Sequence, residues 1–213
     1  MTHRTRIKIC GITSAAAAVS AASAGADALG FVFHKPSPRS IKPEQAWELL
    51  PLLPPFVASV GLFVNASVDE FCEIEEICPT VLSQLHGQES VDVVTQCGPN
   101  IIKAVRFDEA TIEEELARWA DVPEVAAILV DGSAGGEGKA FDWNLLAKHV
   151  RDIDTPIIIA GGLTPMNVAE AIRIVRPYGV DVSSGVESAP GVKDPQLMAA
   201  FCKAVRLADA AAQ

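Results

Sequence analysis

The sequence lacks an excess of positive charge. Lys and Arg together number 17 against 27 Asp and Glu, which gives a formal net charge of −10 at pH 7. A polyanion would meet a repulsive field at such a surface, so we expect no nucleic-acid partner. A small anionic substrate is still compatible with this charge, because helix N-termini and backbone N–H groups create local positive sites inside acidic proteins.

The cysteines lack the spacing of a disulfide framework or a metal site. There are five of them, an odd number, and they form neither a CxxC pair nor the Cys/His pattern of a zinc site. We therefore predict reduced thiols and no bound metal.

Long apolar segments are also missing. No apolar run approaches the roughly 20 residues that a membrane-spanning helix needs, and the amino terminus, MTHRTRIKIC, has no apolar core of a signal peptide. These absences predict a soluble, cytoplasmic protein with no membrane partner.

What the sequence does contain is a regular alternation of two kinds of apolar segment. Hydrophobic residues make up 49% of the 213 residues, enough to build the core of a single domain spanning residues 1–213. Short β-branched runs predict strands at 6–10, 28–33, 57–64, 81–85, 101–106, 126–130, 156–160 and 179–183. Helical spacing predicts helices at 14–24, 43–50, 68–77, 90–96, 112–119, 142–149, 165–175 and 195–207. Pro43, Pro165 and Pro195 are each expected in a first helical turn, where a missing N–H costs nothing.

Eight strand–helix repeats fit either a closed barrel or an open doubly wound sheet. Local periodicity does not separate these two folds. The number of repeats and the chain length favour a (β/α)₈ TIM barrel, because such barrels begin at roughly 200 residues. We predict this α/β fold, with an active site at the carboxyl ends of its strands.

The turns after the last two predicted strands suggest a phosphate site. Gly161 and Gly162 follow the seventh strand, and Ser184 and Gly185 follow the eighth. Glycine allows the backbone to approach a ligand closely, and these two loops form the usual phosphate site of such barrels. The alternative is that Gly161 and Gly162 only make a tight turn.

Cys10 and Asp131 are the candidate acid–base residues, because each lies at the carboxyl end of a predicted strand. Strand alternation places Lys8 on the same face as Cys10, so we hypothesise that Lys8 helps hold Cys10 as a thiolate. The structural alternatives are a small buried hydrophobic residue for Cys10 and a capping or loop carboxylate for Asp131.

Arg39 and His86 are candidate binding residues at two further strand ends. The planar guanidinium of Arg39 suits a substrate carboxylate, although a solvated surface arginine is the common alternative. His86, beside Gln84, is either a cavity-lining group or a hydrogen-bonded core or turn histidine.

Short motifs follow one another in a fixed order along nearly the whole chain. They are KICGIT at 8–13, GFVF at 30–33, SPR at 37–39, GLFVN at 61–65, QLHG at 84–87, LVDG at 129–132, GGEGKAFDW at 135–143, AGGL at 160–163 and GVDVSSGVE at 179–187. In this order they resemble the motifs of a known family, phosphoribosylanthranilate isomerase.

The resemblance implies an Amadori rearrangement in tryptophan biosynthesis. Its substrate is N-(5′-phosphoribosyl)anthranilate, and its product is 1-(2-carboxyphenylamino)-1-deoxyribulose 5-phosphate. Asp131 would act as general acid on the ribose ring oxygen, and Cys10 as general base at ribose C2. Substrate nitrogen serves as the electron sink, so no cofactor is expected.

The resemblance also implies the binding roles. Arg39 would bind the anthranilate carboxylate, and His86 would line the anthranilate side. Asp181 would contact the substrate amine. The phosphate would be held by Gly161, Gly162, Ser184 and Gly185.

Two alternatives to this function stay open. One is a bifunctional sugar-phosphate isomerase of histidine and tryptophan biosynthesis, against which Cys10 argues because that class resembles a two-aspartate arrangement. The other is a noncatalytic phosphate-binding barrel. We expect a monomer or a weak homodimer. Glu137 departs from the family pattern, which often has a smaller hydroxyl residue there, so loop closure is expected to differ.

Overall fold

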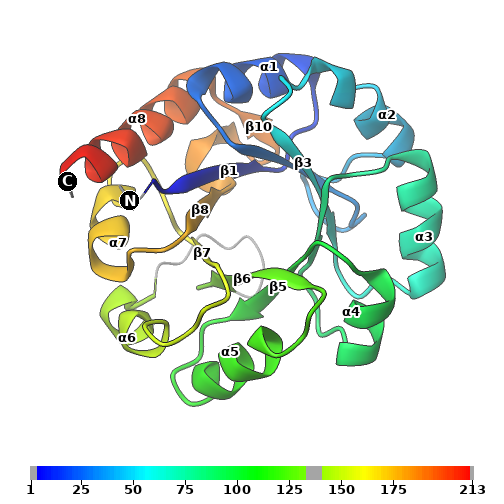
Figure 1. Cartoon of the computed structure of the whole chain (residues 1–213). Coiled ribbons are helices and arrows are strands. Elements are labelled where there is room, and N and C mark those ends of the chain that lie inside the picture. The colour runs from blue at the N-terminus through cyan, green and yellow to red at the C-terminus, as the bar shows by residue number, and fades with distance from the viewer. Residues whose placement is uncertain (1–3, 133–140, 212–213) are drawn as a thin grey trace.

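The computed structural model of the chain describes residues 4–132 and 141–211. Its main sheet is a closed barrel in which β1 to β8 follow one another in sequence order, and each neighbouring pair is parallel. The helices form an outer ring around these strands, and the first strand and the last helix lie next to each other (Figure 1). The predicted (β/α)₈ barrel is therefore confirmed.

The barrel strands are β1 (Arg6–Cys10), β2 (Ala28–Val32), β3 (Ala58–Phe63), β4 (Leu82–Leu85), β5 (Ile101–Arg106), β6 (Val125–Asp131), β7 (Ile157–Ala160) and β8 (Gly179–Val182). The outer helices are α1 (Ala15–Ala24), α2 (Pro43–Trp47), α3 (Val68–Ile77), α4 (Val91–Cys97), α5 (Ile112–Ala120), α6 (Trp143–His149), α7 (Val168–Val175) and α8 (Pro195–Ala211). Among the described helices, none is both long and apolar enough to cross a membrane.

The two faces of the strands have separate roles, which follow from side-chain alternation. Outward residues such as Ile9, Phe31 and Ile128 belong to the large core that lies between the sheet and the helices. The inward residues of the lower barrel form a second apolar cluster that consists of Val60, Ile102, Ala104, Ala127, Leu129, Ile158 and Ala160. This cluster fills much of the barrel interior, and the candidate site residues lie above it, toward the carboxyl ends of the strands.

Helix starts were predicted well where a side chain caps them. Ser14, Ser67 and Ser90 each accept a hydrogen bond from a first-turn N–H, at the starts of α1, α3 and α4. The expected position of Pro165 was wrong, because α7 begins at Val168. Asn167 accepts a hydrogen bond from the Thr164 N–H through its side chain, at 2.7 Å, and this closes a turn ahead of the helix.

Helix α2 is shorter than predicted and ends at Trp47. Pro51 has no N–H to donate to the Trp47 carbonyl, so the α-helical pattern cannot continue. The chain proceeds instead through a 3₁₀ turn, η1 (Leu50–Leu52).

A second 3₁₀ turn and a hairpin that the sequence did not predict follow β8. They are η2 (Ser184–Val186), β9 (Glu187–Ala189) and β10 (Val192–Lys193), of which the two strands pair antiparallel. Gly191 in the hairpin turn has a φ of 80°, and a Cβ there would lie 2.5 Å from the Pro38 carbonyl oxygen. The hairpin is therefore packed closely against the loop that carries Arg39.

Candidate active site

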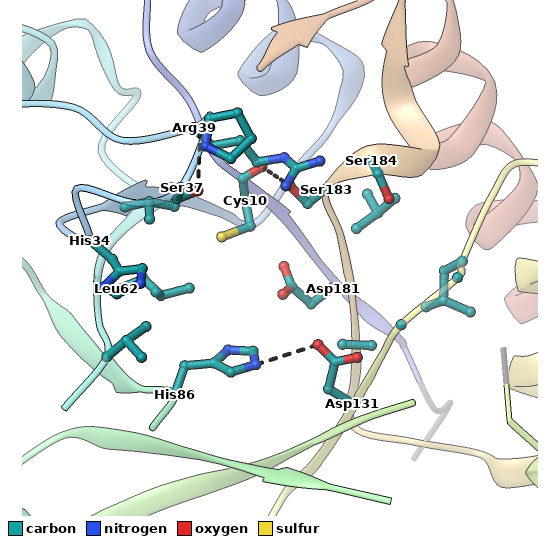
Figure 2. Close-up of a pocket in the computed structure, with 18 of the residues that line it drawn as sticks. Cys10, His34, Ser37, Arg39, Leu62, His86, Asp131, Asp181, Ser183 and Ser184 are labelled. Carbon is teal, nitrogen blue, oxygen red and sulfur yellow. Dashed lines mark hydrogen bonds and ion pairs between the residues drawn. The ribbon is translucent and has the colours of Figure 1, made fainter. Parts of the chain in front are cut away.

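A cavity of about 320 Å³ is open at the carboxyl ends of the barrel strands. Figure 2 shows side chains from several strands pointing into it. The sequence-predicted residues that line it are Cys10, Arg39, His86, Asp131, Gly161, Gly162, Asp181 and Ser184. Residues that sequence reasoning did not single out also line it, among them His34, Leu62 and Ser183.

Cys10 ends β1 and is buried in the wall of this cavity. Its neighbour on β2 is Gly30, where an added Cβ would lie 2.7 Å from the Cys10 Sγ. The absence of a side chain at Gly30 thus makes room for the sulfur.

The pKa of Cys10 is shifted in the direction opposite to the one predicted. Burial raises the pKa of the Cys10 thiol, and the nearby Lys8 ammonium opposes this without overcoming it. Lys8 also donates to Asp181 Oδ1 at 3.0 Å; burial alone would lower the pKa of Lys8, but Asp181 and Cys10 raise it. Lys8 acts on the pKa of Cys10 in the predicted direction, but burial outweighs it, so the pKa of the thiol lies above its ordinary value instead of below it.

Replacing Lys8 with methionine should raise the pKa of Cys10 further. The substitution removes the cation that favours the thiolate and leaves the Asp181 carboxylate, which opposes it. Because only the thiolate reacts, the pH profile of Cys10 alkylation by iodoacetamide should move to higher pH.

The matched control for this experiment is the double variant Lys8→Met/Asp181→Asn, which removes both charges of the pair. Its profile should return toward that of the unmodified protein. An alkylation profile unchanged in folded Lys8→Met would refute the influence of Lys8 on Cys10.

Asp131 ends β6 on the opposite side of the cavity from Cys10, as Figure 2 shows. His86 Nε2 lies 3.4 Å from Asp131 Oδ2. Gly161, with a φ of 84°, lies so close that an added Cβ would be 2.6 Å from Asp131 Oδ1. The turn after β7 therefore lies against the carboxylate, which a side chain at position 161 would displace.

Arg39 is held by a carboxylate of the protein itself. Its Nε donates to Glu187 Oε1 at 2.8 Å and its Nη2 donates to Glu187 Oε2 at 2.9 Å. These hydrogen bonds raise the pKa of Arg39 above its usual value. A guanidinium has five N–H donors, so three remain after these two bonds. Glu187 thus holds one edge of the Arg39 guanidinium, the group predicted to bind a substrate carboxylate.

Glu187 and Lys193 are polar residues that sequence reasoning missed. Lys193 Nζ donates to Glu187 Oε1 at 2.6 Å and to the Ser183 carbonyl oxygen at 3.0 Å. Ser183 Oγ in turn donates to the Cys10 carbonyl oxygen at 3.0 Å. Glu187 could have been noticed in the sequence because it is the last residue of the GVDVSSGVE motif. Its pairing with Arg39 could not, because the two residues are 148 positions apart.

The turns after β7 and β8 meet at the predicted phosphate region. Gly161 and Gly162 both have positive φ, 84° and 66°, and Ser184 lines the cavity. Gly185 does not line it. A Cβ at Gly185 would lie 1.9 Å from the Leu163 carbonyl oxygen, so this glycine instead allows the two loops to pack together.

Glu137 lies outside the residues that the structure describes. Within 4–132 and 141–211, no cluster of three or more His, Cys, Asp or Glu side chains is arranged to hold a metal ion.

The chain is similar to known proteins over almost its full length. The family model described as N-(5′-phosphoribosyl)anthranilate (PRA) isomerase matches residues 7–204. An N-(5′-phosphoribosyl)anthranilate isomerase from Magnetococcus marinus is 49% identical over 207 residues, which are 95% of this chain and 96% of that protein.

Solved structures of the same family are also similar to this chain. A phosphoribosyl anthranilate isomerase from Thermus thermophilus has a TM-score of 0.87 and 37% identity, covering 95% of this chain and 99% of that one. Another phosphoribosyl anthranilate isomerase, in complex with reduced 1-(o-carboxyphenylamino)-1-deoxyribulose 5-phosphate, has a TM-score of 0.84 and 38% identity, covering 95% and 98%.

Proposed function

Because this chain belongs to the N-(5′-phosphoribosyl)anthranilate isomerase family, we propose that it converts N-(5′-phosphoribosyl)anthranilate into 1-(2-carboxyphenylamino)-1-deoxyribulose 5-phosphate in tryptophan biosynthesis. The observation that carries the proposal is one cavity that holds a thiol and a carboxyl group together with an arginine and two Gly- and Ser-containing turns. These are the groups that a substrate with one phosphate, one carboxylate and two proton-transfer sites requires.

Ring opening is the first chemical step. Asp131, as the acid, gives its proton to the ribose ring oxygen while the C1–O bond breaks, and the substrate nitrogen lone pair forms an iminium with C1. The positive charge on nitrogen makes the proton at C2 acidic. A neighbouring carboxylate favours this cation, and Asp181, which lines the same cavity, supplies one.

Proton removal from C2 is the second step. Cys10, as its thiolate, takes this proton, and the C2–H electrons form the double bond of an enolamine. The enolamine then tautomerises to the 2-keto product, so no atom is gained or lost overall. Burial raises the pKa of Cys10, which makes the thiolate a stronger base once it forms. Lys8 and Lys193 both favour that form.

Two subsites hold the ends of the substrate. The remaining donors of Arg39 bind the anthranilate carboxylate, and backbone N–H groups of the Gly161–Gly162 turn together with Ser184 bind the phosphate. His86 lies on the Asp131 side of the cavity (Figure 2). We propose that this fixed placement, rather than any cofactor, brings acid and base to the two reacting atoms.

The test is an assay of the purified protein with freshly generated N-(5′-phosphoribosyl)anthranilate. We expect catalytic formation of the rearranged product. A folded protein that binds the reduced product analogue but forms no product would support a noncatalytic phosphate-binding barrel. Turnover of the histidine-pathway aminoaldose would support the bifunctional alternative.

A further inference from the structure

Gln84 is a fully buried polar residue in the interior of the barrel, with 0% of its surface exposed. Strand alternation on β4 places Leu82, Gln84 and His86 on the inner face. Leu82 packs against the apolar cluster below, and His86 lines the cavity above. Gln84 does not line the cavity, so any part it takes in the reaction passes through another residue.

The side-chain amide of Gln84 is only half paired. Its Nε2 lies 2.7 Å from His86 Nδ1, and its Oε1 has no hydrogen-bond partner among the described residues. An unpaired buried carbonyl is costly, and an apolar side chain of the same size would avoid that cost. Among the described residues, the contact with His86 is the one hydrogen bond of the Gln84 side chain.

An amide nitrogen can only donate, so in this orientation of the amide His86 Nδ1 is the acceptor. With Nδ1 accepting from Gln84, a neutral ring has its proton on Nε2. That nitrogen lies 3.4 Å from Asp131 Oδ2. The three side chains thus form a line from the buried amide through the ring to the carboxyl group.

We propose that Gln84 is a positioning residue for the isomerisation: while Asp131 is a carboxylate, the Gln84 amide holds His86 in the tautomer that presents an N–H to it. The inference rests on the proposed role of Asp131 as the general acid. An N–H directed at Oδ2 fixes the orientation of the carboxyl group across the cavity from Cys10.

The same amide also suits the protonated form of Asp131. If the amide rotates by 180°, Oε1 accepts from an Nδ1–H, and the bare Nε2 of His86 accepts from the Asp131 O–H. The two arrangements occupy the same volume. A methionine at position 84 would provide neither of them.

The direct test is the ¹⁵N NMR spectrum of the His86 ring, which distinguishes the Nε2–H and Nδ1–H tautomers. The chain has four histidines, and the His86→Gln variant identifies the His86 signals. In the ligand-free protein near neutral pH we expect the Nε2–H tautomer alone. In Gln84→Met we expect a mixture of both tautomers.

Leu82→Met is the matched control, because it places the same side chain two residues earlier on the same face of β4. It should leave the His86 spectrum unchanged. Two tautomers in the wild-type protein, or a single unchanged tautomer in folded Gln84→Met, would overturn the inference. The wild-type spectrum can overturn the inference even if Gln84→Met does not fold, because two tautomers, or the Nδ1–H tautomer alone, would contradict it.

Kinetics provide the second readout. Gln84→Met should lower kcat on the order of ten-fold, a part of the roughly 10²- to 10⁴-fold that a positioned acid contributes, while KM stays nearly constant. A rise in KM alone would contradict a positioning role. An active Asp131→Asn variant would instead refute the proposed acid, and that failure is distinguishable because the tautomer measurement does not depend on turnover.

Discussion

Replacing Cys10 with alanine should abolish almost all turnover of N-(5′-phosphoribosyl)anthranilate while the barrel remains folded. The variant retains the carboxyl group, the arginine and the phosphate turns, but nothing at position 10 can accept the C2 proton. General-base catalysis contributes roughly 10²- to 10⁴-fold, and we expect kcat to fall by that order. KM should change little, because the proposed binding contacts come from other residues.

A comparison of two further variants makes this prediction specific. Cys10→Ser keeps a similar shape but offers a hydroxyl, which is a far weaker base than a thiolate at neutral pH, so it should be nearly as inactive. Cys202→Ala removes another buried cysteine, on α8 and outside the cavity, and should keep full kcat apart from a loss of stability. Turnover of folded Cys10→Ala within a few-fold of wild type would exclude Cys10 as the base.

Replacing Asp131 with asparagine should produce a loss of similar size. The amide has nearly the same shape as the carboxyl group but cannot deliver a proton to the ribose ring oxygen, so ring opening loses its acid. We again expect kcat to fall on the order of 10²- to 10⁴-fold. Binding of a reduced product analogue, measured by calorimetry, should be retained.

Asp108→Asn is the matched control, since Asp108 is an exposed carboxylate in the loop after the neighbouring strand β5. It caps a turn by accepting from the Ala110 N–H, so its loss should affect local stability and not kcat. If Asp131→Asn and Asp108→Asn were equally active, Asp131 would not be the acid.

The double variant Cys10→Ala/Asp131→Asn should be little worse than either single one. Asp131 acts at ring opening and Cys10 at proton removal from C2, so the slower of the two impaired steps limits turnover and the second substitution adds little to the loss. Multiplicative losses would instead indicate that both side chains act in the same rate-limiting transition state.

The sequence determined the strands and helices of the barrel because their signals are local. Alternating β-branched runs and helical spacing specify strands and helices without reference to distant residues, and their number limits how the sheet can close. The same local order places Cys10 and Asp131 at strand ends. Their meeting in one cavity could therefore be predicted, as could that of Arg39, His86 and the Gly161–Gly162 turn.

Helix boundaries were predictable only where local chemistry sets them. A serine cap is visible in the sequence, and so is a proline, but the effect of a proline depends on its surroundings. Pro43 begins α2 as expected, whereas Pro165 lies in a turn that the Asn167 side chain closes before α7 begins. Whether a helix begins at a proline or after a nearby capping turn therefore depends on hydrogen bonds that form only in the folded chain.

The electrostatics of the site were decided by the tertiary structure alone. Closure of the barrel pairs β1 with β8 and so brings Lys8 to Asp181, 173 positions apart. The hairpin after β8 likewise brings Glu187 to Arg39. Periodicity along the chain reveals which face of a strand a side chain occupies. It does not reveal which charged residue of another strand faces that side chain, or how far the side chain is shielded from water. For this reason the sequence identified Cys10, and only the folded barrel revealed that burial raises its pKa.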